Sequence, residues 1–260
     1  MILLLKLVLT PLLVGGSAYA ARRWGPAIGG WLIALPLTSG PVLAFLSLDH
    51  GTSFAAAAGV GSLSGLAGIS IYSIAYDRVA RRLGPGPSLG VATMSFFATG
   101  LILLPMLGVP AMVVAAVVLA AITLAARLIP PSGLVHPPIP YPRWDLPARM
   151  IVATGLVLGI TTFAPLLGPQ WSGLLATFPV YVSVLTAFTH HHNGRIAAAD
   201  VLAGTLAGLF GTVAFYLVVI GTVVQLGPLA AFGGALVAAL AIEAVALRRT
   251  VRAGVEPEPV

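Results

Sequence analysis

The stretch GPAIGGWLIALPLTSGPVLAFLSLDHGTSFAAAAGVGSLSGLAG, residues 25–68, has a counterpart in GPQWSGLLATFPVYVSVLTAFTHHHNGRIAAADVLAGTLAGLFG, residues 168–211. Aligned without gaps at an offset of 143 residues, 15 of the 44 positions are identical. The matches that composition alone explains least are the Gly-Pro pairs at 25–26 and 168–169, Pro36 with Pro179, and Phe45 with Phe188. The sequence therefore predicts an internal duplication.

The composition is typical of an integral membrane protein. Of 260 residues, 58% are hydrophobic and 8% are charged, whereas about a quarter of the residues of a soluble domain are charged. The chain has no cysteine, which excludes disulfides, Fe–S clusters and thiolate metal sites. The net charge of +6 comes from basic residues in short loops, so membrane orientation explains it better than nucleic-acid binding does.

Nine apolar segments are long enough to cross a bilayer, which needs about 20 residues each. They are residues 2–20, 27–48, 54–76, 88–107, 111–128, 149–168, 171–189, 196–220 and 228–247. The first segment also resembles a cleavable signal peptide with small residues at 18–20. We expect it to be a retained helix, because no basic residue precedes its apolar run and it has a counterpart in the second half.

The arginines give the orientation of these nine segments. With the N-terminus outside, every basic residue except Lys6 falls on one side of the bilayer, which the positive-inside rule makes the cytoplasmic side. The residues on that side are Arg22, Arg23, Arg78, Arg81, Arg82, Arg127, Arg143, Arg149, Arg195, Arg248, Arg249 and Arg252. We expect a multi-pass protein of a bacterial inner membrane with a cytoplasmic C-terminus.

This map predicts an all-α, polytopic fold with a 4+1+4 arrangement. Residues 1–107 form one four-helix repeat, and residues 149–247 form the second. Residues 108–148 supply one linking helix and a proline-rich cytoplasmic loop, and residues 248–260 form a disordered tail. Because an odd number of crossings separates equivalent positions, the second repeat is inverted relative to the first, as in many secondary transporters.

Two prolines lie at matched positions inside apolar segments. A proline frees backbone carbonyls of the preceding turn, which then need partners in lipid. Polar residues surround both, and the candidate substrate-binding residues are Pro36, Thr38, Ser39, Thr177, Pro179, Tyr181 and Ser183. One interpretation is a pair of kinked helices that line a central pocket at the bilayer midplane. The alternative is two kinks whose carbonyls are satisfied locally by Ser and Thr side chains.

Small residues four apart, at Gly61 and Gly65 and again at Gly204 and Gly208, predict close helix packing. The pattern places the third and eighth helices against each other, with Ser62, Ser64 and Thr205 exposed near the crossing. Asp200 is a candidate for proton or cation coupling, or else a carboxylate favoured by a helix N-terminus. Glu243 is expected to extend toward the cytoplasmic surface near Arg248.

The run His190-His191-His192 favours a turn at the cytoplasmic interface, with metal binding or pH sensing as the alternative. The sequence has no phosphate-binding glycine loop and no His-Glu-x-x-His, which argues against an enzyme. No cofactor is expected.

The pattern IGGWLIALPLTSGPVL at 28–43, the turn at Gly51, the Tyr72–Tyr76 region and Leu83-Gly84 with Ser88-Leu89-Gly90 resemble the GlpM family of small bacterial inner-membrane proteins. The resemblance covers residues 5–105 and, more weakly, 149–247. It implies that this chain is a fused double of a four-helix unit, and that single-unit relatives assemble as antiparallel pairs. The family is linked to exopolysaccharide production.

Two functions fit these patterns. The first is a small transporter or facilitator for an unknown small solute, with its site between Pro36 and Pro179. The second is a non-catalytic membrane subunit of an envelope or exopolysaccharide assembly, with a homodimer or another membrane protein as partner. The lipid bilayer is a partner in both cases. A third alternative is a channel.

Overall fold

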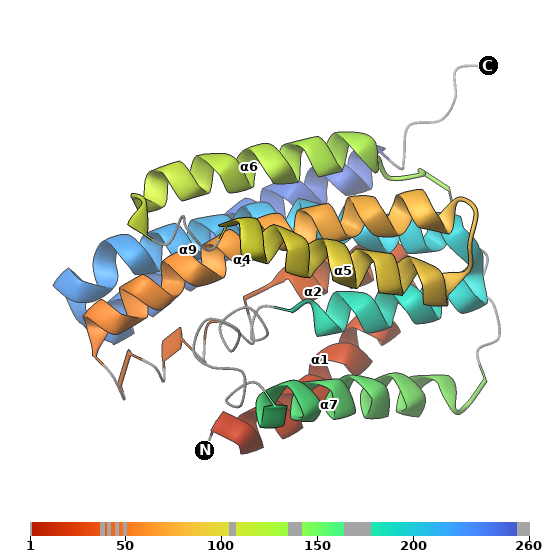
Figure 1. Cartoon of the computed structure of the whole chain (residues 1–260), viewed down its shortest axis with the longest axis horizontal. Coiled ribbons are helices and arrows are strands. Elements are labelled where there is room, and N and C mark those ends of the chain that lie inside the picture. Colours follow the sequence, from red (N-terminus) through yellow and green to blue (C-terminus); the bar gives the residue numbers. More distant parts are fainter. Residues whose placement is uncertain are drawn as a thin grey trace.

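A computed structural model of the chain describes residues 2–36, 40, 43–44, 47–48, 51–103, 108–134, 142–163 and 178–253. Within these ranges the chain forms helices and no strands. The helices are α1 (Ile2–Trp24), α2 (Pro26–Ala34), α4 (Thr52–Ala80), α5 (Pro85–Leu103), α6 (Ala111–Leu128), α7 (Asp145–Phe163) and α9 (Val180–Ala253) (Figure 1). In this part of the chain, α4, α5, α6 and α9 as far as Val245 are long and apolar enough to cross a membrane.

The 74-residue α9 is three successive segments, because its backbone leaves helical geometry at Gly194 (φ 82°) and Gly227 (φ 75°). We call residues 180–193, 195–226 and 228–253 its first, second and third segments. A positive φ is favourable only for glycine. Gly51, the counterpart of Gly194 at the offset of 143, has φ 90° at the start of α4. Aligned positions of the two halves therefore turn in the same way.

The offset continues beyond residue 211. Leu83-Gly84-Pro85 and Leu226-Gly227-Pro228 are identical and lie 143 residues apart. The first tripeptide joins α4 to α5, and the second joins the second segment of α9 to the third. The paired elements are thus α4 with the second segment, and α5 with the third.

Contacts along α4 show that it runs antiparallel to the second segment of α9. At one end of α4, an Arg195 guanidinium nitrogen lies 3.8 Å from an Asp77 carboxylate oxygen. Toward the other end, Gly59 packs against the side chain of Ile220. The second and third segments are antiparallel as well, since Gly211 packs against Glu243 and Phe215 against Phe232.

In contrast, α2 runs parallel to the second segment. Ala27 packs against Gly204, and further along α2 Ala34 packs against Gly208. The first segment of α9 likewise runs parallel to α4, since Ser183 lies near Tyr72 and His190 near Tyr76. Two elements of the first half thus lie beside the second half over most of their length.

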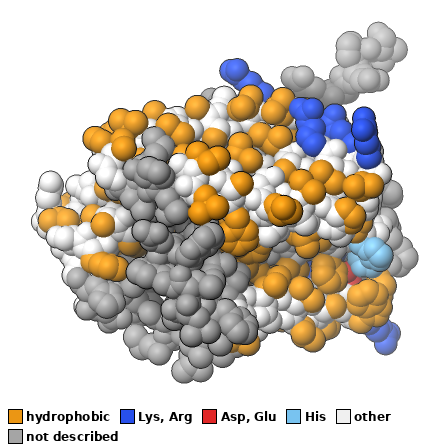
Figure 2. All heavy atoms as spheres, in the orientation of Figure 1, with side chains coloured by type: hydrophobic (Ala, Val, Ile, Leu, Met, Phe, Trp, Pro, Cys, Tyr) orange, Lys and Arg blue, Asp and Glu red, His pale blue; other side chains and the backbone are white. Residues whose placement is uncertain are grey.

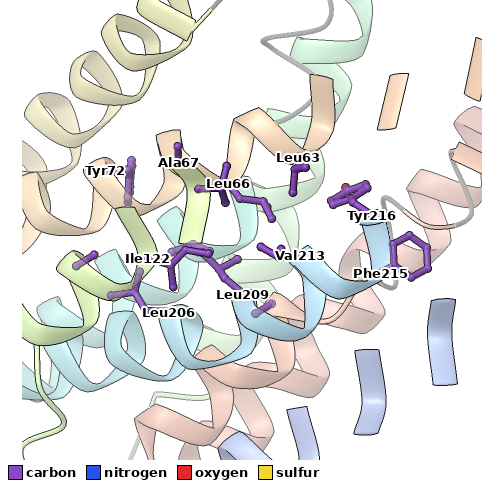
Figure 3. Close-up of a cluster of buried hydrophobic side chains, with 14 of the residues drawn as sticks. Leu63, Leu66, Ala67, Tyr72, Ile122, Leu206, Leu209, Val213, Phe215 and Tyr216 are labelled. Atoms are coloured by element: carbon purple, nitrogen blue, oxygen red, sulfur yellow. The ribbon is translucent and has the colours of Figure 1, made fainter. Parts of the chain in front are cut away.

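The buried core joins both halves. Side chains of α4 (Leu63, Leu66, Ala67), α6 (Ile122) and the second segment of α9 (Leu206, Leu209, Val213) meet in one cluster (Figure 3). Large apolar side chains elsewhere point outward, as lipid requires; examples are Met94, Ile102, Met112 and Ile151. In Figure 2 apolar side chains are spread over the described part of this face, and the Lys and Arg side chains lie mostly at one end.

We call the end of the molecule where most of the Lys and Arg side chains lie the charged end (Figure 2). It includes the α4–α5 turn and the start of α7 (Figure 1). At its centre Asp145, fully buried, accepts hydrogen bonds from Arg22 of α1 and Arg149 of α7. His192 Nε2 lies 2.9 Å from the other oxygen of the same carboxylate. These contacts fasten the start of α7 to α1 and to the turn at Gly194.

Candidate solute site at two broken helices

Pro36 interrupts its helix rather than bending it. The regular helix α2 ends at Ala34, and Leu35 adopts φ −55° and ψ 138°. The residue before a proline avoids helical geometry because the proline ring crowds its backbone and Cβ. The Pro36 carbonyl then accepts a hydrogen bond from Gly40 N–H at 2.9 Å, which is a helical contact. The prediction of a kink is therefore wrong here, since the helix stops and restarts.

Pro179 has the same geometry on its C-terminal side. The helix begins at Val180, directly after the proline, and the Pro179 carbonyl accepts a hydrogen bond from Ser183 N–H at 2.9 Å. Gly40 and Ser183 are themselves a pair at the offset of 143. The two prolines are both buried, and each stands at the start of a helical stretch, where its fixed φ and missing N–H cost least.

The broken end of α2 is held by the second segment of α9. The Thr212 hydroxyl donates to the Ala34 carbonyl at 2.5 Å, and the Thr205 hydroxyl lies 3.2 Å from the Gly30 carbonyl. Thr205 is fully buried, so the prediction that it is exposed is wrong. The Ala34 carbonyl needs this hydroxyl because α2 ends at Ala34, and a bare carbonyl in an apolar interior is costly.

Glycines allow this close approach. A Cβ at Gly204 would overlap the Ala27 carbonyl, and one at Gly208 would lie 2.6 Å from the Ala34 Cβ. Both glycines therefore pack helices together, as predicted, but the helix over them is α2 rather than α4. For Gly61 and Gly65, the structure shows that the first accepts a hydrogen bond from Ser64 within its own helix.

A buried polar seam lies beside Pro179. Tyr72 of α4 faces Ser183 of the first segment of α9, and Thr186 is one turn further along the same face. Each side chain is at most 2% exposed. Tyr72 and Ser183 are close enough to interact, but by donor–acceptor distance and angle none of the three hydroxyl oxygens forms a hydrogen bond within the described residues. Buried polar atoms in native proteins are nearly always paired, so three neighbouring hydroxyls without partners indicate a place for a solute or water.

The seam lies well inside the bundle. Thr186 and Ser183 precede the Gly194 turn by 8 and 11 residues, which is about 12 and 16 Å along a helix. These distances are about half the thickness of a hydrocarbon layer, which is about 30 Å. At the charged-end side of the seam, the Tyr76 hydroxyl lies 3.2 Å from His190 Nδ1.

The predicted site residues are only partly brought together. Ser183 lies in the seam, whereas the Tyr181 hydroxyl is 3.1 Å from that of Thr10 and so faces α1. Thr38, Ser39 and Thr177 lie outside the described residues. Sequence reasoning missed Tyr72 and Thr186. The signal that could have found them is a polar residue inside an apolar segment with a second polar residue one turn or less away.

Asp200 has a structural contact. Its carboxylate accepts hydrogen bonds from Ser132 N–H at 2.7 Å and from the Ser132 hydroxyl at 2.6 Å. It thereby holds the chain that leaves α6 against the second segment of α9. This geometry fits the structural alternative for Asp200 better than a coupling role.

The histidines lie at the charged end. His192 lies beside Asp145, and His190 beside Tyr76. Within the described ranges, no group of three His, Asp or Glu side chains has an arrangement that would hold a metal ion. An open cavity of about 290 Å³ at this end is lined by Asp77, Arg81 and Arg195 together with residues that follow α6. It is a feature of the bundle end and lies away from the seam.

Comparison with known proteins adds no relative. No family model matches the chain, and neither a curated protein nor a solved structure does.

Proposed function

We propose that this protein is a small membrane transporter or facilitator whose solute binds at the seam formed by Tyr72, Ser183 and Thr186. The observation that carries the proposal is this buried group of unpartnered hydroxyls beside a helix that begins at Pro179. The described residues of the seam carry no charge, so the solute is uncharged and bears hydroxyl or carbonyl groups. Such groups match the donors and acceptors of the three side chains.

An inverted repeat in a bacterial inner membrane would supply the movement. Pro36 and Pro179 support it, because these two prolines at matched positions each precede a helical hydrogen bond from the residue four positions later. The antiparallel course of the paired elements α4 and the second segment of α9 supports it as well. In such a fold, nine helices with the N-terminus outside let the two halves exchange conformations, which exchanges access between the faces.

A swelling assay tests the proposal. Proteoliposomes are placed in iso-osmotic glycerol, ribitol, arabinose or urea, and entry of the solute is followed by light scattering. We expect at least one solute to enter faster than in empty liposomes. Entry should fall about tenfold or more in Ser183→Ala with Thr186→Val, because each change removes a hydrogen-bonding group worth about 1 kcal/mol.

The matched control is Ser70→Ala with Thr123→Val. These hydroxyls donate to carbonyls of their own helices, Leu66 and Leu119, so entry should stay near that of the unchanged protein. Pro36→Ala with Thr38→Ala should also slow entry, since it lets α2 continue through its break. If the control variant lost as much solute entry as the seam variant, the assignment of the seam as the solute site would be wrong. No entry of any solute, together with a stable membrane partner in pull-down, would favour the subunit alternative.

A further inference from the structure

Glu243, in the third segment of α9, is a buried acid that the proposed solute site does not use. It is fully buried, and neither carboxyl oxygen has a hydrogen-bond partner among the described residues. The prediction that it extends toward the surface near Arg248 is therefore wrong. Glu243 follows the Gly227 break by 16 residues, about 24 Å along the helix, so it lies inside the predicted span.

The side chain is seated against a glycine. A Cβ at Gly211 would overlap Glu243 Cγ, so the second segment of α9 has room for the acid only because residue 211 has no side chain. Gly68 is the counterpart of Gly211 at the offset of 143. There the ring of Phe96 from α5 fills the space, 2.9 Å from where a Cβ would lie. The two halves thus fill the same gap with an aromatic ring in one case and a carboxyl group in the other.

The acid is close to the broken end of α2. Thr212, the residue after Gly211, is the one whose hydroxyl holds the Ala34 carbonyl. A change in the charge of Glu243 therefore acts on the backbone of the second segment one residue from that contact. A conformational change at the break would in turn change the surroundings of the carboxyl group.

Ionisable residues are sparse on the elements around Glu243. On its own helix the nearest are Arg248 and Arg249, five and six residues later. The second segment has only Tyr216 between Asp200 and the Gly227 break, and α2 has none. The described carboxylates with cationic partners, Asp77 and Asp145, are at the charged end. A lone carboxylate inside a bilayer is expensive, and such residues mark ion and proton pathways.

We propose that Glu243 is a proton-binding site of this protein, and that its protonation and deprotonation couple solute movement to a proton gradient. In the state described here the carboxyl group carries the proton. Release breaks its O–H bond and delivers the proton to water on the side that is then open. The coupling half of this proposal rests on the proposed function, whereas the proton site itself does not.

Labelling with dicyclohexylcarbodiimide tests the proton site. This apolar reagent reacts with protonated carboxyl groups in lipid. The full-length protein in liposomes is treated over a range of pH and analysed by peptide mass spectrometry. We expect an adduct on Glu243 that declines as the pH rises, with at least tenfold less on Asp145, which is paired with arginines. If Glu243 were labelled no more than Asp145 at every pH, the proposal would be overturned. This experiment uses the unchanged protein, so it does not depend on whether a variant folds.

Proton-driven accumulation tests the coupling. Proteoliposomes with an acidic exterior are given the solute identified by swelling, and accumulation and internal pH are recorded. We expect Glu243→Gln, which keeps the neutral shape of the acid, to retain downhill entry and to lose accumulation and proton influx. Equal accumulation by both proteins would overturn the coupling while leaving transport intact. If no solute enters in any protein, the proposed function fails, and the labelling result still decides the proton site.

Discussion

At the scale of single residues, the contact between Thr212 and Ala34 shows what holds a helix break in lipid. The hydroxyl of Thr212 is a partner for a carbonyl at the end of α2. Thr212→Val keeps the shape of the side chain and removes the donor. We expect a loss of about 1–3 kcal/mol in unfolding free energy, because a buried carbonyl is left without a partner. Denaturant titration of the purified protein in detergent micelles measures it.

Thr222→Val is the matched control for that change. The Thr222 hydroxyl donates to the Val218 carbonyl within its own helix at 2.6 Å, so its loss leaves the helical backbone bond in place. We expect a change of less than about 0.5 kcal/mol. If both variants lost equal stability, the Ala34 carbonyl would have another partner, and the break would not depend on Thr212.

The sequence predicts the effects of proline and glycine on the backbone better than the directions of polar side chains, for a physical reason. Proline and glycine act on their own backbone, so Pro36, Pro179 and Gly194 are visible in the sequence as places where helical geometry ends or begins. The direction of a polar side chain depends on which helix lies opposite, which local periodicity does not contain. Tyr181 therefore faces α1, and Glu243 lies in a gap left by a glycine 32 residues earlier.

At the scale of elements, the packing of α2 on the second segment of α9 depends on glycine. The obstacle to a side chain at Gly204 is the backbone carbonyl of Ala27, which cannot rotate away as a flexible side chain can. Gly204→Ala should therefore separate the two helices and lower the unfolding free energy by about 1–3 kcal/mol. Thermal unfolding in detergent micelles measures the change.

Gly155→Ala in α7 is the control for this substitution. A Cβ at Gly155 would have no atom within 4 Å, so only the helix propensity changes, in favour of alanine by about 1 kcal/mol. The unfolding free energy should fall in Gly204→Ala and rise in Gly155→Ala. A stabilised Gly204→Ala would mean that α2 does not pack there. The sequence predicted this close packing from the spacing of small residues, but it gave no sign of which helix would fill the space.

At the scale of the whole molecule, the sequence predicted an all-helical chain with several segments long and apolar enough to span a membrane, and the described residues confirm both features. The number of crossings and the inverted repeat stay predictions, because they depend on how the bilayer surrounds the helices. The chain is convenient for deciding them, since it has no cysteine of its own. Single cysteines can be placed on matched exposed positions without removing native thiols.

Two pairs at the offset of 143 give the sharpest test: Ser53 with Ile196, just after the turns at Gly51 and Gly194, and Gly86 with Leu229, just after those at Gly84 and Gly227. All four residues are exposed. In an inverted repeat with the N-terminus outside, a membrane-impermeant maleimide added to intact cells should label Ser53→Cys and Leu229→Cys. Gly86→Cys and Ile196→Cys should react only after permeabilisation.

The pattern matters more than any one position, because each alternative predicts a different one. Two repeats of the same orientation would place Ser53 with Ile196 and Gly86 with Leu229 on common faces. A reversed insertion of the whole chain would exchange the two labelled sets and keep the partners of each pair apart. Only partners on opposite faces are compatible with two halves that exchange conformations, so labelling of Ser53→Cys and Ile196→Cys from one side would remove the structural basis for alternating access.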